Sequence, residues 1–257
     1  MSVNLFDISG QHAIVTGASS GLGAQFAKAL AAQGVKVALF ARRLDKLEQL
    51  AAEIEEEFGV RALPIKCDVN DTDAVNAAVA EVEDKFGTIE ILINNAGVAR
   101  SVPAEDQSDD DWNAVIDTNL SSVYKMSRAV GKIMKKNGYG RIINLGSIHS
   151  KVAMPGMPIS GYVASKHGVI GLTKDLAAEW AKDGITVNAI GPAYFESEMT
   201  GGFIGSEPFQ GVLRAYCPMG RAGKPGELDG AVIYFASKAS SFTTGQYLAI
   251  DGGWTAI

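Results

Sequence analysis

The chain has 257 residues, of which 47% are hydrophobic, and a formal net charge of −6. These values allow a substantial core, and we treat residues 1–257 as a single domain. The acidic balance and the lack of a basic run argue against a nucleic-acid partner. The sequence shows neither a secretory leader nor an apolar run long enough to span a bilayer. We therefore expect a soluble cytoplasmic protein without a membrane partner.

No metal site is expected. Cys67 and Cys217 follow no metal-ligand spacing, and we interpret both as buried or unused thiols that suit a reducing compartment. His12 and His167 have no neighbours in the sequence that suggest chemistry.

A glycine-rich segment follows the first short apolar run of the chain, at residues 12–16. Residues 17–23 read Gly-Ala-Ser-Ser-Gly-Leu-Gly, and a helical pattern continues behind them. Such a turn brings backbone N–H groups and a helix N-terminus onto an anion such as a phosphate. The spacing departs from the commoner Gly-x-Gly-x-x-Gly fingerprint, and an ordinary tight turn is the alternative. We predict phosphate contacts from Gly17, Ser19, Ser20, Gly21, Leu22 and Gly23.

The end of the second apolar run, residues 35–41, bears on the choice of cofactor. A site that prefers NAD would carry Asp or Glu near this point to bind the ribose 2′-hydroxyl. This chain instead has Ala41 followed by Arg42 and Arg43. Two guanidinium groups without a carboxylate favour the 2′-phosphate of NADP(H) over NAD(H). The alternative is that the arginines only begin the next exposed helix.

Further ligand-binding residues are expected where the next two strands end. We predict strands at residues 61–67 and 89–93, separated by a helix at residues 71–86. Open α/β sheets bind ligands beyond the carboxyl ends of their strands. The residues predicted to contact a cofactor there are Asp68 and Val69 after the third strand, and Asn95, Ala96 and Gly97 after the fourth.

Tyr162 and Lys166 stand four residues apart at the start of an apolar segment with helical period. On a helix, this spacing makes them surface neighbours. A cation about 4 Å away favours phenolate by about 1 kcal/mol in water and about 4 kcal/mol in a partly screened site. Tyr162 is thereby predicted to be a general acid or base for an alcohol or ketone. Ser147, just after the buried strand predicted at residues 141–146, is placed to hydrogen-bond the same oxygen.

The remaining chain completes an alternation of strands and helices. We predict a sixth strand at residues 185–190, a final helix at 227–237 and a last strand at 246–250. Residues 193–217 are expected to be irregular and to form a lid or substrate pocket. The alternation indicates one doubly wound, parallel α/β sheet of about seven strands flanked by helices.

Along nearly its whole length the chain resembles the short-chain dehydrogenase/reductase family. The shared motifs are Thr16-Gly-Ala-Ser-Ser-Gly-Leu-Gly23, Asn94-Asn-Ala-Gly97, Asn119, Ser147 and Tyr162-x-x-x-Lys166, all in family order. The resemblance implies a Rossmann-type sheet, a nicotinamide cofactor and a homotetramer. It also implies an alcohol–ketone oxidoreductase. A cofactor-sensing scaffold protein without turnover is the non-enzyme alternative.

The resemblance further implies roles for four residues. Tyr162 exchanges the proton, Lys166 lowers its pKa and holds the nicotinamide ribose, Ser147 orients the substrate carbonyl, and Asn119 anchors a water that relays protons. The gap from Ser147 to Tyr162 is longer than is usual in the family, and Ser150 is the alternative to Ser147.

Two residues near the sixth strand also carry implied cofactor contacts. The family's Pro-Gly appears here as Pro192-Ala193, and Ser197 stands where the family often has threonine.

Within the family, residues 191–200, 217–221 and 251–254 resemble gluconate 5-dehydrogenases, which implies a keto-sugar acid or polyol as substrate. His149, Tyr194 and Phe195 are predicted to contact it. The neighbouring Met154, Met157, Met199 and Phe203 make the pocket rather apolar. A hydroxysteroid or a 3-oxoacyl thioester therefore remains an alternative substrate.

Overall fold

The computed structural model describes residues 4–198 and 200–256. Within them, seven strands form one parallel sheet in the order β3-β2-β1-β4-β5-β6-β7. The order reverses between β1 and β4, which creates the crevice where sheets of this type bind ligands. The strands are β1 His12–Thr16, β2 Lys36–Ala41, β3 Ala62–Lys66, β4 Ile91–Asn94, β5 Gly140–Leu145, β6 Ile185–Pro192 and β7 Tyr247–Ile250.

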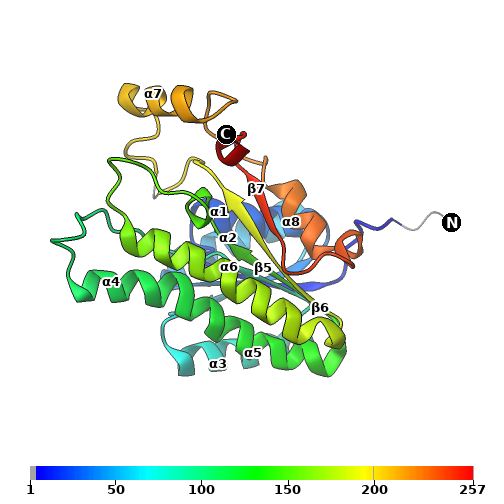
Figure 1. The fold of residues 1–257 in the computed structure, drawn as a ribbon. Coiled ribbons are helices and arrows are strands. Elements are labelled where there is room, and N and C mark those ends of the chain that lie inside the picture. Colours follow the sequence, from blue (N-terminus) through cyan, green and yellow to red (C-terminus); the bar gives the residue numbers. More distant parts are fainter. Residues whose placement is uncertain (1–3, 199, 257) are drawn as a thin grey trace.

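Helices cover both faces of the sheet (Figure 1). The α-helices are α1 Gly21–Ala31, α2 Leu44–Phe58, α3 Thr72–Phe86, α4 Asp109–Ile116, α5 Ser122–Asn137, α6 Ser160–Trp180, α7 Glu207–Tyr216 and α8 Asp229–Ala236. Helices α1, α2 and α8 pack on one face and α3, α5 and α6 on the other. The doubly wound architecture predicted from the sequence is confirmed.

Alternation along β1 shows how each strand serves both layers. Ala13 and Val15 point into the core with α1, α2 and α8, whereas Ile14 points into the core with α3, α5 and α6. Strand β5 is buried along its whole length. Such strands need apolar residues on both faces, which is why they appear as continuous hydrophobic runs in the sequence.

The expectation that residues 193–217 are irregular is wrong in part, because Glu207–Tyr216 forms helix α7. Ser206 occupies the N-cap position and a proline lies in the first turn, both of which favour helix initiation. Phe209 and Leu213, four residues apart, are buried against Tyr194 and Trp254. In Figure 1, α7 stands outside the two helical layers, near the C-terminus.

None of the helices in residues 4–198 and 200–256 is long and apolar enough to cross a membrane.

Candidate active site

The glycine-rich turn between β1 and α1 is packed so tightly that two of its glycines are required. Gly17 has a φ of 66°, and a Cβ atom there would lie 2.9 Å from the Ala96 Cα. A Cβ atom on Gly23 would overlap the Gly17 carbonyl oxygen and lie 2.6 Å from Asn95 Nδ2. The turn therefore presents bare backbone at the N-terminus of α1, as a phosphate site requires.

The turn is tied to the loop after β4. The Thr16 hydroxyl accepts hydrogen bonds from the backbone N–H groups of Asn95 (2.9 Å) and Ala96 (3.1 Å). In return, Asn95 Nδ2 donates to the carbonyl oxygens of Thr16 (3.0 Å) and Gly17 (3.3 Å). These bonds fix both sides of the crevice between β1 and β4. The sequence analysis assigned no role to Thr16, because the residues that its hydroxyl contacts lie about 80 positions away in the chain.

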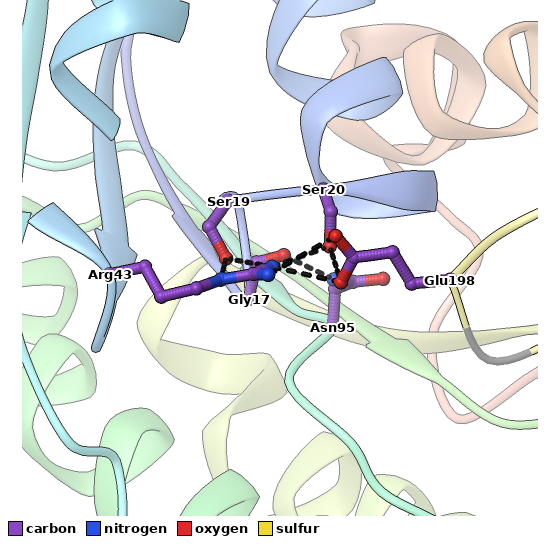
Figure 2. A network of polar contacts seen from close by, with 6 residues as sticks. All are labelled: Gly17, Ser19, Ser20, Arg43, Asn95 and Glu198. Atoms are coloured by element: carbon purple, nitrogen blue, oxygen red, sulfur yellow. Dashed lines mark hydrogen bonds and ion pairs between the residues drawn. The ribbon is translucent and has the colours of Figure 1, made fainter. Parts of the chain in front are cut away.

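Arg43 lies against the same turn, as Figure 2 shows. Its Nη2 atom donates to the hydroxyls of Ser19 and Ser20, both at 3.0 Å. The guanidinium also binds the Glu198 carboxylate, through Nη1 (3.1 Å) and Nη2 (2.9 Å). Arg42 is exposed and forms no side-chain hydrogen bond or ion pair within the described residues. Of the two predicted arginines, the structure thus brings only Arg43 to the turn.

The other predicted cofactor residues lie around this edge of the sheet. Asp68 is half-buried just after β3 and accepts a hydrogen bond from the Asn70 backbone (3.0 Å). Val69 and Pro192 are buried, the latter at the end of β6. The Ser197 side chain packs on the turn, where a Cβ atom on Gly21 would lie 3.2 Å from it.

Leu22 and Gly97 complete the predicted set. The Leu22 side chain packs partly into the core beneath α1. Gly97 lies beside Asn119, whose Oδ1 atom would be 3.4 Å from a Cβ at that position.

Ser147 and Tyr162 face each other between β5 and α6. Burial raises the pKa of Tyr162 above its ordinary value, and a hydrogen bond with Ser147 acts in the opposite direction. Ser150, the alternative to Ser147, instead donates its hydroxyl to the Lys166 carbonyl oxygen at 2.9 Å. It also accepts a bond from the Ser147 backbone at 3.2 Å. Ser147, and not Ser150, is therefore the serine that hydrogen-bonds Tyr162.

Lys166 is buried, and its Nζ atom donates to the Leu145 carbonyl oxygen at 2.6 Å. The Nζ atom lies 5.6 Å from the centre of the Tyr162 ring. Burial lowers the pKa of Lys166 to about 8. The sequence-based expectation that Lys166 lowers the Tyr162 pKa is not met, because burial dominates at both groups.

Asn119 lies in a π-helical turn, Asp117–Ser121, between α4 and α5. Single π-turns within helices often mark functional sites. The Asn119 amide bonds both backbone groups of Val98, accepting at 2.8 Å and donating at 2.9 Å. It also donates to Ser165 (3.1 Å), whose hydroxyl donates to the Tyr162 carbonyl oxygen (2.7 Å). Asn119 therefore connects the loop after β4 with the helix that carries Tyr162.

His149 is buried beside Tyr162, with ring centres 6.0 Å apart. Its Nδ1 atom lies 3.2 Å from the Val152 carbonyl oxygen, which can only accept, so Nδ1 carries the proton. Burial lowers the pKa of His149, which favours the neutral ring. Nε2 is then an acceptor for the Tyr194 hydroxyl at 3.3 Å. His149 and Tyr194 are thus brought together next to Tyr162.

Phe195 lies elsewhere, contrary to its predicted contact with substrate. Its side chain belongs to the core with α1 and α8, and its ring occupies the space above Gly223. Phe195 forms an isolated bridge with Gly223, and successive side chains of such extended backbone point to opposite sides. Met199, also named in the apolar pocket, lies outside the described residues.

Tyr247 is a supporting residue that sequence reasoning missed. Its hydroxyl donates to the Ser147 carbonyl oxygen at 2.7 Å, although the two residues are 100 positions apart. A Cβ atom on Gly191 would collide with this hydroxyl, so the glycine makes room for it. No local motif marks Tyr247, because the contact depends on the pairing of β7 with β6.

Within residues 4–198 and 200–256, no group of three His, Cys, Asp or Glu side chains is arranged to hold a metal ion.

Comparison with known proteins reveals relatives across the whole chain. A family model described as enoyl-(acyl carrier protein) reductase matches residues 17–255. Gluconate 5-dehydrogenase of Gluconobacter oxydans is 42% identical over 252 residues, covering 98% of this chain and 97% of that protein. D-threitol dehydrogenase of Mycolicibacterium smegmatis is 40% identical, covering 97% and 95%.

The structural match is equally extensive. A gluconate 5-dehydrogenase from Burkholderia cenocepacia, solved in complex with NADP and tartrate, is 37% identical and superposes with a TM-score of 0.94. The match covers 99% of this chain and 98% of that one. Together with the site geometry, these similarities show that the chain belongs to the short-chain dehydrogenase/reductase family of oxidoreductases, which act on alcohol groups with a nicotinamide cofactor.

Proposed function

We propose that this protein is an NADP(H)-preferring oxidoreductase that interconverts a secondary alcohol and a ketone, with a keto-sugar acid or polyol as substrate. The observation that carries this proposal is the placement of Ser147 and Tyr162 beside the buried Lys166, at the edge of the sheet that also bears the glycine-rich turn. The similarity to gluconate 5-dehydrogenase and D-threitol dehydrogenase supports the choice of substrate class.

The residues present fit a dinucleotide phosphate. Gly17 and Gly23 leave no space for a side chain, and the N-terminus of α1 points its N–H groups at the turn. Arg43 and Ser20 already hold an anionic group, the Glu198 carboxylate, in the way they would hold a phosphate, and the Ser19 hydroxyl accepts a hydrogen bond from the same guanidinium. A bound nicotinamide supplies or accepts the hydride.

The protein's own residues provide the proton and the orientation. Its raised pKa keeps Tyr162 protonated at neutral pH, so its phenol can donate a proton to the oxygen of a ketone. Ser147 is placed to donate a second hydrogen bond to the same oxygen. Below about pH 8, Lys166 is an ammonium that would stabilise negative charge developing at this site and would bind a ribose hydroxyl of the cofactor. Asn119 holds the loop after β4 in register with α6.

The aromatic residues near the pocket do not exclude a polar substrate, because most of them pack against one another. Tyr194, Phe209 and Trp254 are buried against one another and against Leu213 of α7. They therefore form the core of the 193–217 segment rather than an open apolar wall. The polar pair of His149 and Tyr194 remains next to Tyr162, where it can bind a hydroxylated substrate.

A 3-oxoacyl thioester or a hydroxysteroid is the second candidate substrate. It is supported by Met154 and Trp254, which line a pocket of about 150 Å³ beside the aromatic cluster. The match to a family model described for acyl carrier protein substrates supports the thioester in particular.

We also propose a homotetramer in the cytoplasm. A surface groove of about 540 Å³ runs between α5 and α6, with Leu120, Tyr124 and Leu172 in its lining. We propose that the subunits pair through these two long helices, on which Tyr124 is 46% exposed. Light scattering tests this assembly, since Leu172→Glu should lower the measured mass. The two free, buried cysteines suit a reducing compartment.

The substrate is tested by the rate of NADPH oxidation across a panel of ketones. The panel contains 5-ketogluconate, other keto-sugars, an acetoacetyl thioester and several oxo-steroids. Turnover confined to the keto-sugars supports the proposal, whereas turnover confined to the thioester or the steroids replaces its substrate class.

A further inference from the structure

The Glu198 carboxylate occupies the position where the glycine-rich turn and Arg43 bind an anion. It accepts two hydrogen bonds from the Arg43 guanidinium and one from the Ser20 hydroxyl at 2.9 Å (Figure 2). Ser20 is the N-cap residue of α1, yet its side chain makes no capping bond to the helix. Its hydroxyl is instead directed at Glu198. The three residues come from segments that follow β1, β2 and β6.

The charges around Glu198 explain why its carboxylate stays ionised. Hydrogen bonds from Arg43 and Ser20 lower the pKa of Glu198, and Lys46 lowers it further. Arg43 in turn has Asp45 nearby. Glu198 is therefore an anion at neutral pH that is paired with the Arg43 guanidinium beside the turn.

The contact also attaches the 193–217 segment to the turn. Ser197 packs on Gly21, and the Thr200 hydroxyl accepts a hydrogen bond from the Ser197 backbone at 3.0 Å. Thr200 also donates to the Phe195 carbonyl oxygen at 2.6 Å. These bonds hold residues 195–198 in a compact turn with Glu198 facing Arg43. A phosphate that takes the place of the carboxylate must therefore also release this part of the segment.

We propose that Glu198 is an internal competitor for the anion site of Arg43, Ser19 and Ser20, and that it thereby sets how strongly the enzyme prefers NADP(H) over NAD(H). The inference rests on the proposed function, in which Arg43 binds the 2′-phosphate. NADP(H) must displace the carboxylate to reach Arg43. NAD(H) carries no 2′-phosphate, so it can bind while the Arg43–Glu198 pair remains intact. Glu198 therefore weakens the binding of the phosphorylated cofactor selectively.

The size of the effect follows from exposure. The side chains of Arg43 and Glu198 are 45% and 62% exposed, so solvent screens the pair strongly. Removing the carboxylate is expected to tighten NADPH binding by about fivefold. Binding of NADH is expected to change by less than about twofold, since its binding does not require the pair to break.

The test is the dissociation constant of NADPH and of NADH, measured by fluorescence titration without a ketone. The variant is Glu198→Gln, which keeps the size of the side chain and removes its charge. Glu196→Gln is the matched control, because Glu196 is an exposed carboxylate two positions away without a hydrogen bond or ion pair in the described residues. Only Glu198→Gln should tighten NADPH selectively.

Arg43→Ala separates the failure of this inference from failure of the proposed cofactor preference. If Arg43→Ala weakens NADPH selectively but Glu198→Gln changes both cofactors equally or neither, the inference is wrong and the preference stands. If Arg43→Ala leaves the two affinities in their original ratio, the proposed preference itself is wrong. In the Arg43→Ala background, Glu198→Gln should no longer tighten NADPH, because its competitor role acts through Arg43.

Discussion

Two regions of the same sheet edge hold their polar groups in opposite ways. Around Tyr162 and Lys166, the polar groups are half-buried or buried, and loss of contact with water is the largest cause of both pKa shifts. Around Arg43 and Glu198, the groups are exposed, and hydrogen bonds between opposite charges are the largest cause. We call the first region the catalytic group and the second the anion site.

The difference teaches where each part of the function resides. In the catalytic group, the Tyr162 hydroxyl carries the proton and the Lys166 ammonium the charge, and water has little access to either. Substitutions there should therefore have large effects on the rate. In the anion site, water and salt compete with every contact, so substitutions should have small, salt-dependent effects. The catalytic group is therefore expected to set the rate, and the anion site the choice of cofactor.

The largest expected effect is that of Tyr162→Phe. Loss of the phenol should lower kcat by about 10²-fold to 10⁴-fold, the usual contribution of a general acid. Tyr234→Phe is the control, because it removes a hydroxyl on α8 that bonds the Thr243 hydroxyl and none of the catalytic residues. Steady-state rates with saturating cofactor and ketone measure both. Full activity in Tyr162→Phe would remove the phenol from the proton transfer.

Lys166→Met tests burial of the ammonium through stability. Because burial lowers the pKa of Lys166 from 10.5 to about 8, the unfolded chain binds this proton more tightly between those values. The free energy of unfolding of the wild type should therefore rise, relative to Lys166→Met, as the pH increases through this window. The gain is up to about 3 kcal/mol.

Urea unfolding of both proteins at several pH values measures this difference. A pH-independent difference would mean that the Lys166 pKa is not shifted, and would break the contrast between the two regions.

Gly23→Ala tests how rigidly the glycine-rich turn is packed. The added methyl group would meet the Gly17 carbonyl oxygen and Asn95, so we expect a loss of about 1–3 kcal/mol in stability. Cofactor affinity should fall as well. Gly230→Ala is the control, because this helical glycine has open space around it and should gain stability by up to about 1 kcal/mol. Thermal unfolding measures the stability of both variants. Equal stabilities would show that the turn can move to accommodate the added methyl group.

The sequence predicts the catalytic group better than its electrostatics. Tyr162 and Lys166 lie in one helix, and Ser147 directly follows a buried strand, so local patterns place all three. The pKa of Tyr162 was expected to fall because of a nearby cation, but it rises because of burial. Burial depends on how β5, α6 and the segment after β6 pack, and no local pattern contains that information.

Contacts between segments that are distant in the chain could not be predicted from the sequence either. Tyr247 reaches Ser147 through the pairing of β6 and β7, and Glu198 reaches Arg43 from a segment 155 residues away. Helix α7 was not predicted because it has only ten residues and lies within a stretch rich in glycine and aromatic residues, which is typical of irregular structure. The predicted contact of Phe195 with substrate rested on the apolar composition of its segment. The extended backbone at Phe195 instead directs the ring toward Gly223 and the core.

The measurement that tests the division most directly is the ratio of kcat/KM for NADPH and NADH in the wild type and Arg43→Ala. We expect the wild type to prefer NADPH, Arg43→Ala to lower this preference by about tenfold, and kcat with saturating cofactor to stay unchanged. An unchanged ratio in Arg43→Ala, or a kcat that falls together with it, would contradict the separation of cofactor choice from catalysis.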